Sequence, residues 1–267
     1  MYEIELNKVY NMDNLELLKQ MENESVDLIY CDILYNTGKK FKDYNDNLGT
    51  PQEAIEWYKP RLIEMWRVLK YTGSIYLQCD YRLNAYLRVY MDELFGIKNF
   101  KNEIIWKYEA PTSTFKNYPK KHDTILFYSK SDKYTFNYNE SLIPYKEENS
   151  RYNKWDDELK QWYKNYRQKD GTYKRCYKKQ GKPSDVFDIP FLQNNSKERV
   201  GYDTQKPKEL LNKIINISSN KGDIVADFFC GSGTSLVVAK ELGRQYIGCD
   251  INPRAIEITN KRLNEIT

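Results

Sequence analysis

A carboxylate, an aromatic ring and an amide follow closely after an apolar run near the start of the chain. Residues 26–31, Val-Asp-Leu-Ile-Tyr-Cys, have the composition of a buried strand, and Asp32, Tyr35 and Asn36 come after it. Open α/β sheets bind their ligands beyond the carboxyl ends of their strands. We therefore expect Asp32 to face a substrate, where its oxygens can accept hydrogen bonds. An aspartate that merely caps a turn is the simpler alternative.

A second chemical signal is a glycine turn near the end of the chain. Residues 225–234 are an apolar run that ends in Gly-Ser-Gly-Thr and leads into a helical pattern. A bound molecule can approach the backbone of such a turn, where the amides of the helix N-terminus face it. Asp250 follows about twenty residues later, where a carboxylate often holds ribose hydroxyls. A tight turn without a ligand, and an Asp250 that caps the last helix with Asn252, are the alternatives.

The elements that must position these residues alternate between strands and helices. This alternation predicts one α/β domain with a mostly parallel sheet. The predicted strands are 2–6, 26–31, 74–80, 103–108, 124–128, the start of 225–234, and 245–249; the predicted helices are 14–21, 51–69, 82–95, 208–218, 235–242 and 253–263. Residues 39–50 are rich in Lys, Asp and Asn, and we expect a mobile loop there, beside the site.

The periodicity is lost over residues 130–195, which we interpret as an inserted module. Residues 146–182 contain 12 Lys and Arg against 6 Asp and Glu, a surplus that exceeds the net charge of +4 of the whole chain. Residues 149–168 could form a helix. The many Tyr and Trp side chains could form a small core or stack on bases, and the basic ones could be a solvated face or bind phosphates. We expect Lys174 and Arg175 to lie on the side of this module that contacts nucleic acid.

Several classes of protein are disfavoured by the composition. The five cysteines form no Cys-x-x-Cys pair and His122 is the single histidine, so a Cys/His metal site is not expected. The scattered cysteines indicate reduced thiols. The N-terminus has neither a basic flank nor a long apolar run, and we expect a cytoplasmic protein without a membrane segment.

Three segments, in this order, resemble DNA amino-methyltransferases. Asp-Ile-Leu-Tyr at 32–35 resembles their Asp-Pro-Pro-Tyr element, Thr-Gln-Lys-Pro at 204–207 looks like the element before their cofactor half, and 227–234 looks like their S-adenosylmethionine loop. A catalytic element that precedes the cofactor loop is similar to the circularly permuted β group of this family of restriction-modification type. The resemblance covers almost the whole chain outside 130–195.

The resemblance implies a Rossmann-like class I methyltransferase fold and three regions. The sheet would have seven strands, mostly parallel with one antiparallel, plus a target-recognition insertion. The catalytic half would be 1–129, the insertion 130–195 and the cofactor half 196–267. The expected partner is double-stranded DNA, with a cognate restriction endonuclease and a homodimer as further expectations from the family.

The resemblance also implies a role for individual residues. Asp32 and the carbonyl of Ile33 would accept hydrogen bonds from an exocyclic amino group, and Tyr35 would stack on the extruded base. The residues that would hold S-adenosylmethionine are Asp227, Phe228, Phe229, Gly231, Gly233, Thr234, Asp250, Thr204 and Lys206. Those expected to contact DNA are Asn36, Lys39, Lys40, Lys174, Arg175, Lys178 and Lys179. A sulfonium is already an activated electrophile, so no metal is needed.

Both prolines of the family element are replaced, by Ile33 and Leu34. Proline restricts the backbone, so a less rigid loop is expected here. Asp at the first position of the element favours adenine N6 over cytosine N4 as the acceptor. The alternatives are N4-cytosine specificity, a catalytically weak or silent nucleic-acid-binding subunit with the same fold, and a methyltransferase acting on RNA or protein.

Overall fold

The computed structural model describes residues 4–40, 44–109, 116–141, 153–159, 161–177 and 183–266. The chain divides into two compact units. The larger comprises residues 1–137 and 185–267, and the smaller comprises residues 138–184.

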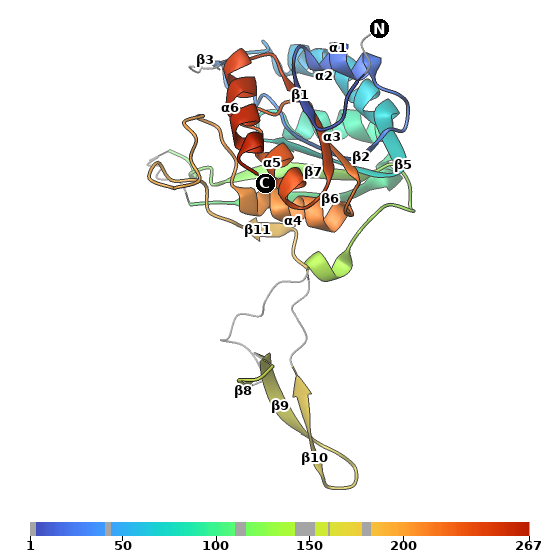
Figure 1. The fold of residues 1–267 in the computed structure, drawn as a ribbon, viewed down its shortest axis with the longest axis vertical. Helices are drawn as coiled ribbons and strands as arrows, with labels where there is room; N and C mark the ends of the chain where they lie inside the picture. Colours follow the sequence, from blue (N-terminus) through green and yellow to red (C-terminus); the bar gives the residue numbers. More distant parts are fainter. Residues whose placement is uncertain are drawn as a thin grey trace. The chain divides into compact units, whose positions relative to one another are not determined.

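The larger unit is built on one sheet of eight strands (Figure 1). Their order is β1 (Lys8–Asn11), β13 (Gln245–Asp250), β12 (Ile224–Asp227), β2 (Val26–Asp32), β5 (Leu69–Cys79), β7 (His122–Ser129), β6 (Phe100–Lys107) and β11 (Val186–Asp188). All neighbours pair in parallel except β7, which is antiparallel to both β5 and β6. The mostly parallel sheet with one antiparallel strand is confirmed. The three-residue strand β11 adds an eighth strand to the seven predicted.

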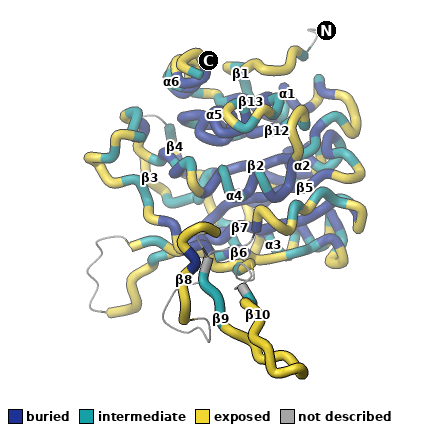
Figure 2. The backbone as a smooth tube through the Cα atoms, turned by 60° about the horizontal axis from the view of Figure 1, so that its bottom comes forward, coloured by how far each residue is buried: buried dark blue, intermediate teal, exposed yellow. Residues whose placement is uncertain are grey.

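Helices cover both faces of this sheet, as the unbroken apolar runs of its strands require. One core cluster joins one set of strand side chains to α1 (Asn14–Gln20), α2 (Pro51–Val68) and α3 (Asn84–Met91). The other joins the alternate side chains to α4 (Lys208–Ser218), α5 (Thr234–Glu241) and α6 (Pro253–Asn264). The central strands β2, β5 and β12 are accordingly buried (Figure 2). Within the described ranges, no helix has the length and apolar character needed to span a membrane.

Turn signals set the helix boundaries. Helix α2 begins with a capping box in which Thr50 and Glu53 bond each other's backbone, with Pro51 in the first turn, where its missing N–H costs nothing. Helix α3 continues into one turn of π-helix, η1 (Asp92–Gly96), and a 3-10 turn, η2 (Ile97–Asn99). The six helices predicted for the larger unit therefore all exist, with ends that differ by a few residues.

Two predictions for the larger unit were wrong in detail. Strand β1 begins at Lys8, because Asn7 has a left-handed backbone (φ 58°) that breaks the extended run, although the Asn7 amide still donates to the Tyr246 carbonyl of β13 at 2.7 Å. Tyr2 and Glu3 of the predicted strand lie outside the described residues. Residues 39–50 are not simply an unpacked loop. Two short strands, β3 (Lys39–Lys40) and β4 (Asn45–Asp46), pair there, and Asp46 is only 2% exposed.

The smaller unit contains a three-stranded antiparallel sheet, and the described residues of its predicted helical range, 153–159 and 161–168, form no helix. Strand β9 (Gln161–Arg167) lies between β8 (Lys154–Asp156) and β10 (Tyr173–Tyr177), and a 3-10 turn, η3 (Tyr138–Ser141), precedes them. The helix suggested for 149–168 is therefore wrong within the described residues. Aromatic side chains such as those of Trp155 and Trp162, which meet across β8 and β9 with centroids 5.3 Å apart, favour a sheet.

The boundaries of the smaller unit, 138 and 184, lie inside the predicted insertion of 130–195. The flanking residues belong to the larger unit because they pack on its sheet. Phe187 and Ile189 are buried there, and Trp106 donates to the Ile189 carbonyl at 2.8 Å. On the other side, Asn137 donates to the Asn216 carbonyl of α4 at 2.8 Å.

Candidate active site

A cavity of about 570 Å³ lies where the parallel strands end. Strands β2 and β12 are neighbours in the sheet, so the residues after them meet at one edge although they are about two hundred positions apart. The lining comes from the segment after β2, from residues 202–206, from the turn after β12 and from the segment after β13. Asp32 and the glycine turn therefore border the same space, as predicted.

Asp32 is held by a cation and a hydroxyl. Its Oδ2 forms an ion pair with Lys206 Nζ, and the Tyr35 hydroxyl lies 2.7 Å from its Oδ1. The Asp32 side chain is 19% exposed. Burial raises the pKa of Asp32, and the Lys206 charge opposes that rise. Its oxygens thus face the cavity as oriented hydrogen-bond acceptors. Lys206, which was expected at the cofactor, contacts Asp32 and also lines the cavity.

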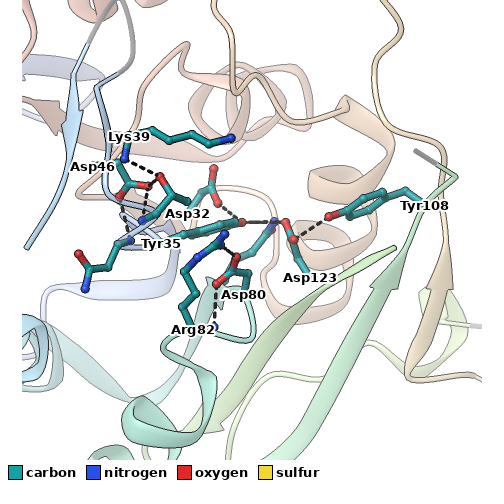
Figure 3. Close-up of polar contacts among 11 residues, drawn as sticks. Asp32, Tyr35, Lys39, Asp46, Asp80, Arg82, Tyr108 and Asp123 are labelled. Atoms are coloured by element: carbon teal, nitrogen blue, oxygen red, sulfur yellow. Dashed lines mark hydrogen bonds and ion pairs between the residues drawn. The ribbon is translucent and has the colours of Figure 1, made fainter. Parts of the chain in front are cut away.

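A polar network continues behind Tyr35 (Figure 3). The Tyr35 hydroxyl also lies 2.8 Å from Asp123 Oδ2, and Gln78 Nε2 donates to both of these oxygens at 2.9 Å. Tyr108 donates to Asp123 Oδ1 at 2.9 Å, and Tyr30 donates to Gln78 Oε1 at 2.7 Å. The Tyr35 hydroxyl is thus committed to two carboxylates, which fixes the position of its ring at the cavity wall.

The segment that replaces the family's two prolines is tethered by hydrogen bonds and burial. The Ile33 amide, which a proline would lack, donates to the Gln78 carbonyl at 3.3 Å, and the Ile33 side chain is 3% exposed. The Tyr58 hydroxyl donates to the Leu34 carbonyl at 2.8 Å. These contacts restrict the backbone after Asp32, so the loop is better fixed than the loss of two prolines alone suggested.

The Asn36 side chain connects this loop to residues 48–49. Its backbone is left-handed (φ 55°), its amide nitrogen donates to the Gly49 carbonyl at 2.8 Å, and its amide oxygen accepts from Leu48 N at 2.7 Å. Asp46 accepts from the backbone amides of Asn36 and Thr37. Both ends of the Asn36 side-chain amide are thus used to connect residues 36 and 48–49, and contact of Asn36 with DNA stays a prediction.

Two carboxylates organise the glycine turn on the other side of the cavity. Asp250 accepts from Gly231 N through Oδ2 and from Asn252 N through Oδ1, each at 2.9 Å. Asp227 accepts from the Ser235 hydroxyl and, at 3.0 Å, from Phe229 N. Burial raises the pKa of Asp227 to about 7. Asn252, not Asp250, is the N-cap of α6, so the capping alternative does not account for Asp250.

Residues that were not found from the sequence brace this turn. Arg262 Nη1, from α6, donates to the Ser232 carbonyl at 2.6 Å and lies 3.0 Å from Thr234 Oγ1. Thr259 donates to the Gly231 carbonyl at 3.0 Å. Both residues lie on α6, whose sequence pattern indicates only an amphipathic helix packed on the sheet. No local sequence signal distinguishes them from the other residues of that helix.

A second brace comes from α1 and α2. Asn14 donates to the Phe228 carbonyl at 3.0 Å and accepts from Arg61 Nε at 2.7 Å. The Arg61 guanidinium lies 3.4 Å from the Trp57 ring centroid, and Trp57 packs against Phe229 with centroids 6.2 Å apart. The cavity wall on this side is thus apolar and aromatic, which suits a flat heterocycle.

Gly233 should tolerate no side chain, whereas Gly222 offers a matched comparison. Both have positive φ (70° and 85°), but a Cβ at Gly233 would lie 2.2 Å from Thr259 Cγ2, and nothing lies within 4 Å of one at Gly222. We expect Gly222→Ala to lower the free energy of unfolding by about 1–2 kcal/mol and Gly233→Ala by about 2–5 kcal/mol, because overpacking adds to the backbone strain. Denaturant titration measures both, and equal losses would contradict the close packing of Thr259.

The lysines and the arginine expected to contact DNA differ in their exposure and in the contacts that they already make. Lys39 and Lys40 are exposed on β3, and Lys174 is exposed on β10. Arg175 is 59% exposed but already forms an ion pair with Asp156 at 3.0 Å and lies over the Tyr163 ring. Lys178 and Lys179 lie outside the described residues. Across the described ranges, no group of three or more His, Cys, Asp or Glu side chains could hold a metal.

Comparison with known proteins decides the family. The model of the N6/N4 methyltransferases, described as DNA methylase, matches residues 26–261. The chain belongs to this DNA methylase family. Among its relatives are Type II methyltransferase M.HpaI of Haemophilus parainfluenzae, 33% identical over 94% of this chain and 72% of the relative, and DNA adenine methyltransferase YhdJ of Escherichia coli, 34% identical over 97% and 83%. Type II methyltransferase M1.MboII of Moraxella bovis is 31% identical over 98% of both chains.

Solved structures of DNA methylases share the fold of this chain. The PvuII DNA methyltransferase (cytosine-N4-specific) has a TM-score of 0.68 at 17% identity, covering 97% of this chain and 87% of that one. The M1.HpyAVI–SAM complex has a TM-score of 0.56 at 22% identity, covering 96% and 99%. This DNA methylase therefore has the Rossmann-like α/β fold predicted for it.

Proposed function

We propose that this DNA methylase transfers a methyl group from S-adenosylmethionine to an exocyclic amino group, adenine N6, of a base extruded from double-stranded DNA. The observation that carries the proposal is the shared cavity: the Asp32 carboxylate and the glycine turn at 231–233 line one space of about 570 Å³. A group transfer needs donor and acceptor side by side, and one cavity of this size suits a nucleoside-like cofactor with an inserted base.

The cofactor belongs at the glycine turn. Gly231 and Gly233, with φ of 49° and 70°, allow close approach to the backbone at the start of α5. Asp250 is placed to accept from ribose hydroxyls while it holds the Gly231 amide. The aromatic wall of Trp57 and Phe229 supplies a face for the adenine ring. Thr204 and Lys206 also line the cavity, and the methionine end would lie against them. Bound there, S-adenosylmethionine supplies an electrophilic methyl group.

The target amino group belongs at Asp32. The lone pair of an exocyclic amine is delocalised into the ring, so the nitrogen becomes nucleophilic only as it rehybridises. Acceptors for its two N–H groups, Asp32 and the Ile33 carbonyl, favour that change and orient the lone pair toward the methyl group. Tyr35 presents its ring to the base while its hydroxyl is held by Asp32 and Asp123.

Adenine is favoured over cytosine by two observations. Asp, rather than Ser, stands at position 32, and one relative at 34% identity is a DNA adenine methyltransferase. Cytosine N4 is the other outcome, since the PvuII enzyme of the same fold is cytosine-N4-specific.

The proposed reaction is tested by product analysis. The full chain is incubated with methyl-labelled S-adenosylmethionine and duplex DNA of mixed sequence, and the DNA is digested to nucleosides. We expect label in N6-methyl-2′-deoxyadenosine, and sequencing of an undigested sample should place the methylated adenines in one defined sequence context. Label in N4-methylcytosine would correct the base, and transfer to RNA or protein with none to DNA would overturn the proposal.

The smaller unit would contribute phosphate contacts. Lys174 is exposed on β10 beside the exposed ring of Tyr173. We expect Lys174→Ala to weaken binding to DNA of any sequence, and to reduce the slope of log affinity against log salt by about one. Lys98→Ala, which removes an exposed lysine of the larger unit before β6, at the end of the sheet away from the cavity, is the matched control. Identical salt slopes for the wild type and both variants would exclude Lys174 from the DNA interface.

A further inference from the structure

The Tyr35 hydroxyl contacts more acceptors than its single proton can serve. It lies 2.7 Å from Asp32 Oδ1 and 2.8 Å from Asp123 Oδ2, and it accepts from Gln78 Nε2 at 2.9 Å. If both carboxylates were ionised, one of the two short oxygen–oxygen contacts would have no hydrogen between its atoms. One additional proton on the pair turns both contacts into hydrogen bonds.

Asp123 is built into this position from three strands. It is buried at the start of β7, the antiparallel strand that begins at the edge where β2 and β5 end. Its two oxygens face Tyr35 and Gln78 on one side and Tyr108, after β6, on the other. Figure 3 shows the resulting chain from Asp32 through Tyr35 and Asp123 to Tyr108. All of these recorded hydrogen-bond partners of Asp123 are neutral groups, whereas Asp32 has Lys206.

We propose that Asp123 is a positioning residue of the methyl-transfer site, which shares one proton with Asp32 through the Tyr35 hydroxyl and so sets the pH range in which Asp32 is free to accept from the amino group. The proposal rests on the function proposed above. Two carboxylates joined in this way are coupled, so a change at Asp123 alters how readily Asp32 takes up a proton. The shared proton also fixes the Tyr35 ring, because the hydroxyl can then donate to one carboxylate and accept from the other at the same time.

The charges around Asp123 determine the sign of the effect. The titratable groups that face it from the surrounding elements are Tyr30, Asp32, Tyr35, Cys79, Asp80 and Tyr108. Asp80 is paired with Arg82, and Asp32 with Lys206. Burial and, to a lesser degree, the Asp123 charge raise the pKa of Asp32. Removing the Asp123 charge lowers that pKa, so Asp32 stays ionised, and active, to lower pH.

The pH dependence of methyl transfer by the full chain tests this with Asp123→Asn. We expect the acid limb of kcat/KM to move down by about one pH unit. Asp188→Asn is the control. It removes an exposed carboxylate of β11 that pairs with Lys107 of the neighbouring strand β6, and it should leave the acid limb in place. A rate lowered equally at every pH, without movement of the limb, would reduce Asp123 to a packing role and overturn the proposal.

Two further measurements separate this proposal from the function it rests on. If the wild type methylates no DNA, the proposed function fails, and titration of the Asp32 carboxyl carbon by NMR, assigned with Asp32→Asn, still decides the proton sharing. If the Asp32 carboxyl signal titrates identically in the wild type and in Asp123→Asn, proton sharing between the two residues is overturned. If Asp123→Asn does not fold, Tyr108→Phe replaces it. Loss of the Tyr108 hydroxyl, which donates to Asp123 Oδ1, moves the shared proton toward Asp123. The acid limb of kcat/KM should therefore shift to lower pH by a smaller amount than in Asp123→Asn. An acid limb that does not move would contradict proton sharing between Asp32 and Asp123.

Discussion

Asp32→Asn should retain cofactor and DNA binding but lower the rate of methyl transfer by roughly 10²–10⁴-fold. An asparagine fills the same volume, but it removes the charge that pairs with Lys206 and leaves one oxygen in place of two. With that oxygen engaged by Tyr35 or by Lys206, no anionic acceptor remains for the amino group. A single-turnover assay with enzyme in excess measures the chemical step alone.

The control for this substitution lies on the same strand. Asp27→Asn removes a carboxylate at the opposite end of β2, where it pairs with Lys70 and accepts from Ile224 N. This variant should lose stability but keep its single-turnover rate per folded molecule. If Asp32→Asn transferred methyl groups as fast as Asp27→Asn, Asp32 would have no part in the chemistry.

Asp250→Asn should weaken cofactor binding by about 10–100-fold, with a smaller effect on DNA binding. Both oxygens of Asp250 accept from backbone N–H groups, those of Gly231 and Asn252. An amide can accept at one of these positions only, so its NH₂ group must face the other N–H donor. Loss of a charged hydrogen bond costs about 1.5–3 kcal/mol, which corresponds to the stated change in the dissociation constant.

Isothermal titration with S-adenosylmethionine measures this effect. Asp223→Asn, which changes a carboxylate just before β12 at the opposite edge of the sheet, should bind the cofactor like the wild type. Equal dissociation constants for the wild type and both variants would show that the Gly231 turn does not depend on Asp250 and would remove Asp250 from the cofactor site.

The sequence predicted the parts of the site that depend on local signals. A strand end is indicated at Asp32, which follows an apolar run, and again at the glycines before α5. The carboxyl ends of parallel strands must lie at the same edge of the sheet. Proximity of residues 32 and 231 therefore followed from two local patterns and one topological rule. The same logic could have found Asp123, because an antiparallel strand begins at the edge where its parallel neighbours end.

What the sequence did not predict depends on contacts between distant segments. Arg262 and Thr259 look like any residues of an amphipathic helix, yet they bond the turn at 231–234. Asn36 is a polar residue of a type common at surfaces, but its side-chain amide hydrogen-bonds to the backbone of residues 48 and 49. The aromatic, charged run around 154–167 fits a helix or a strand equally by composition, and cross-strand pairing decides for the strand.

A crystal structure of the full chain with S-adenosylhomocysteine would test the central claim most directly. We predict that the ribose hydroxyls contact Asp250, that the adenine lies against Trp57 and Phe229, and that the sulfur faces Asp32 across the cavity. A ligand bound elsewhere, or a sulfur separated from Asp32 by the protein's own side chains, would contradict transfer between these two groups.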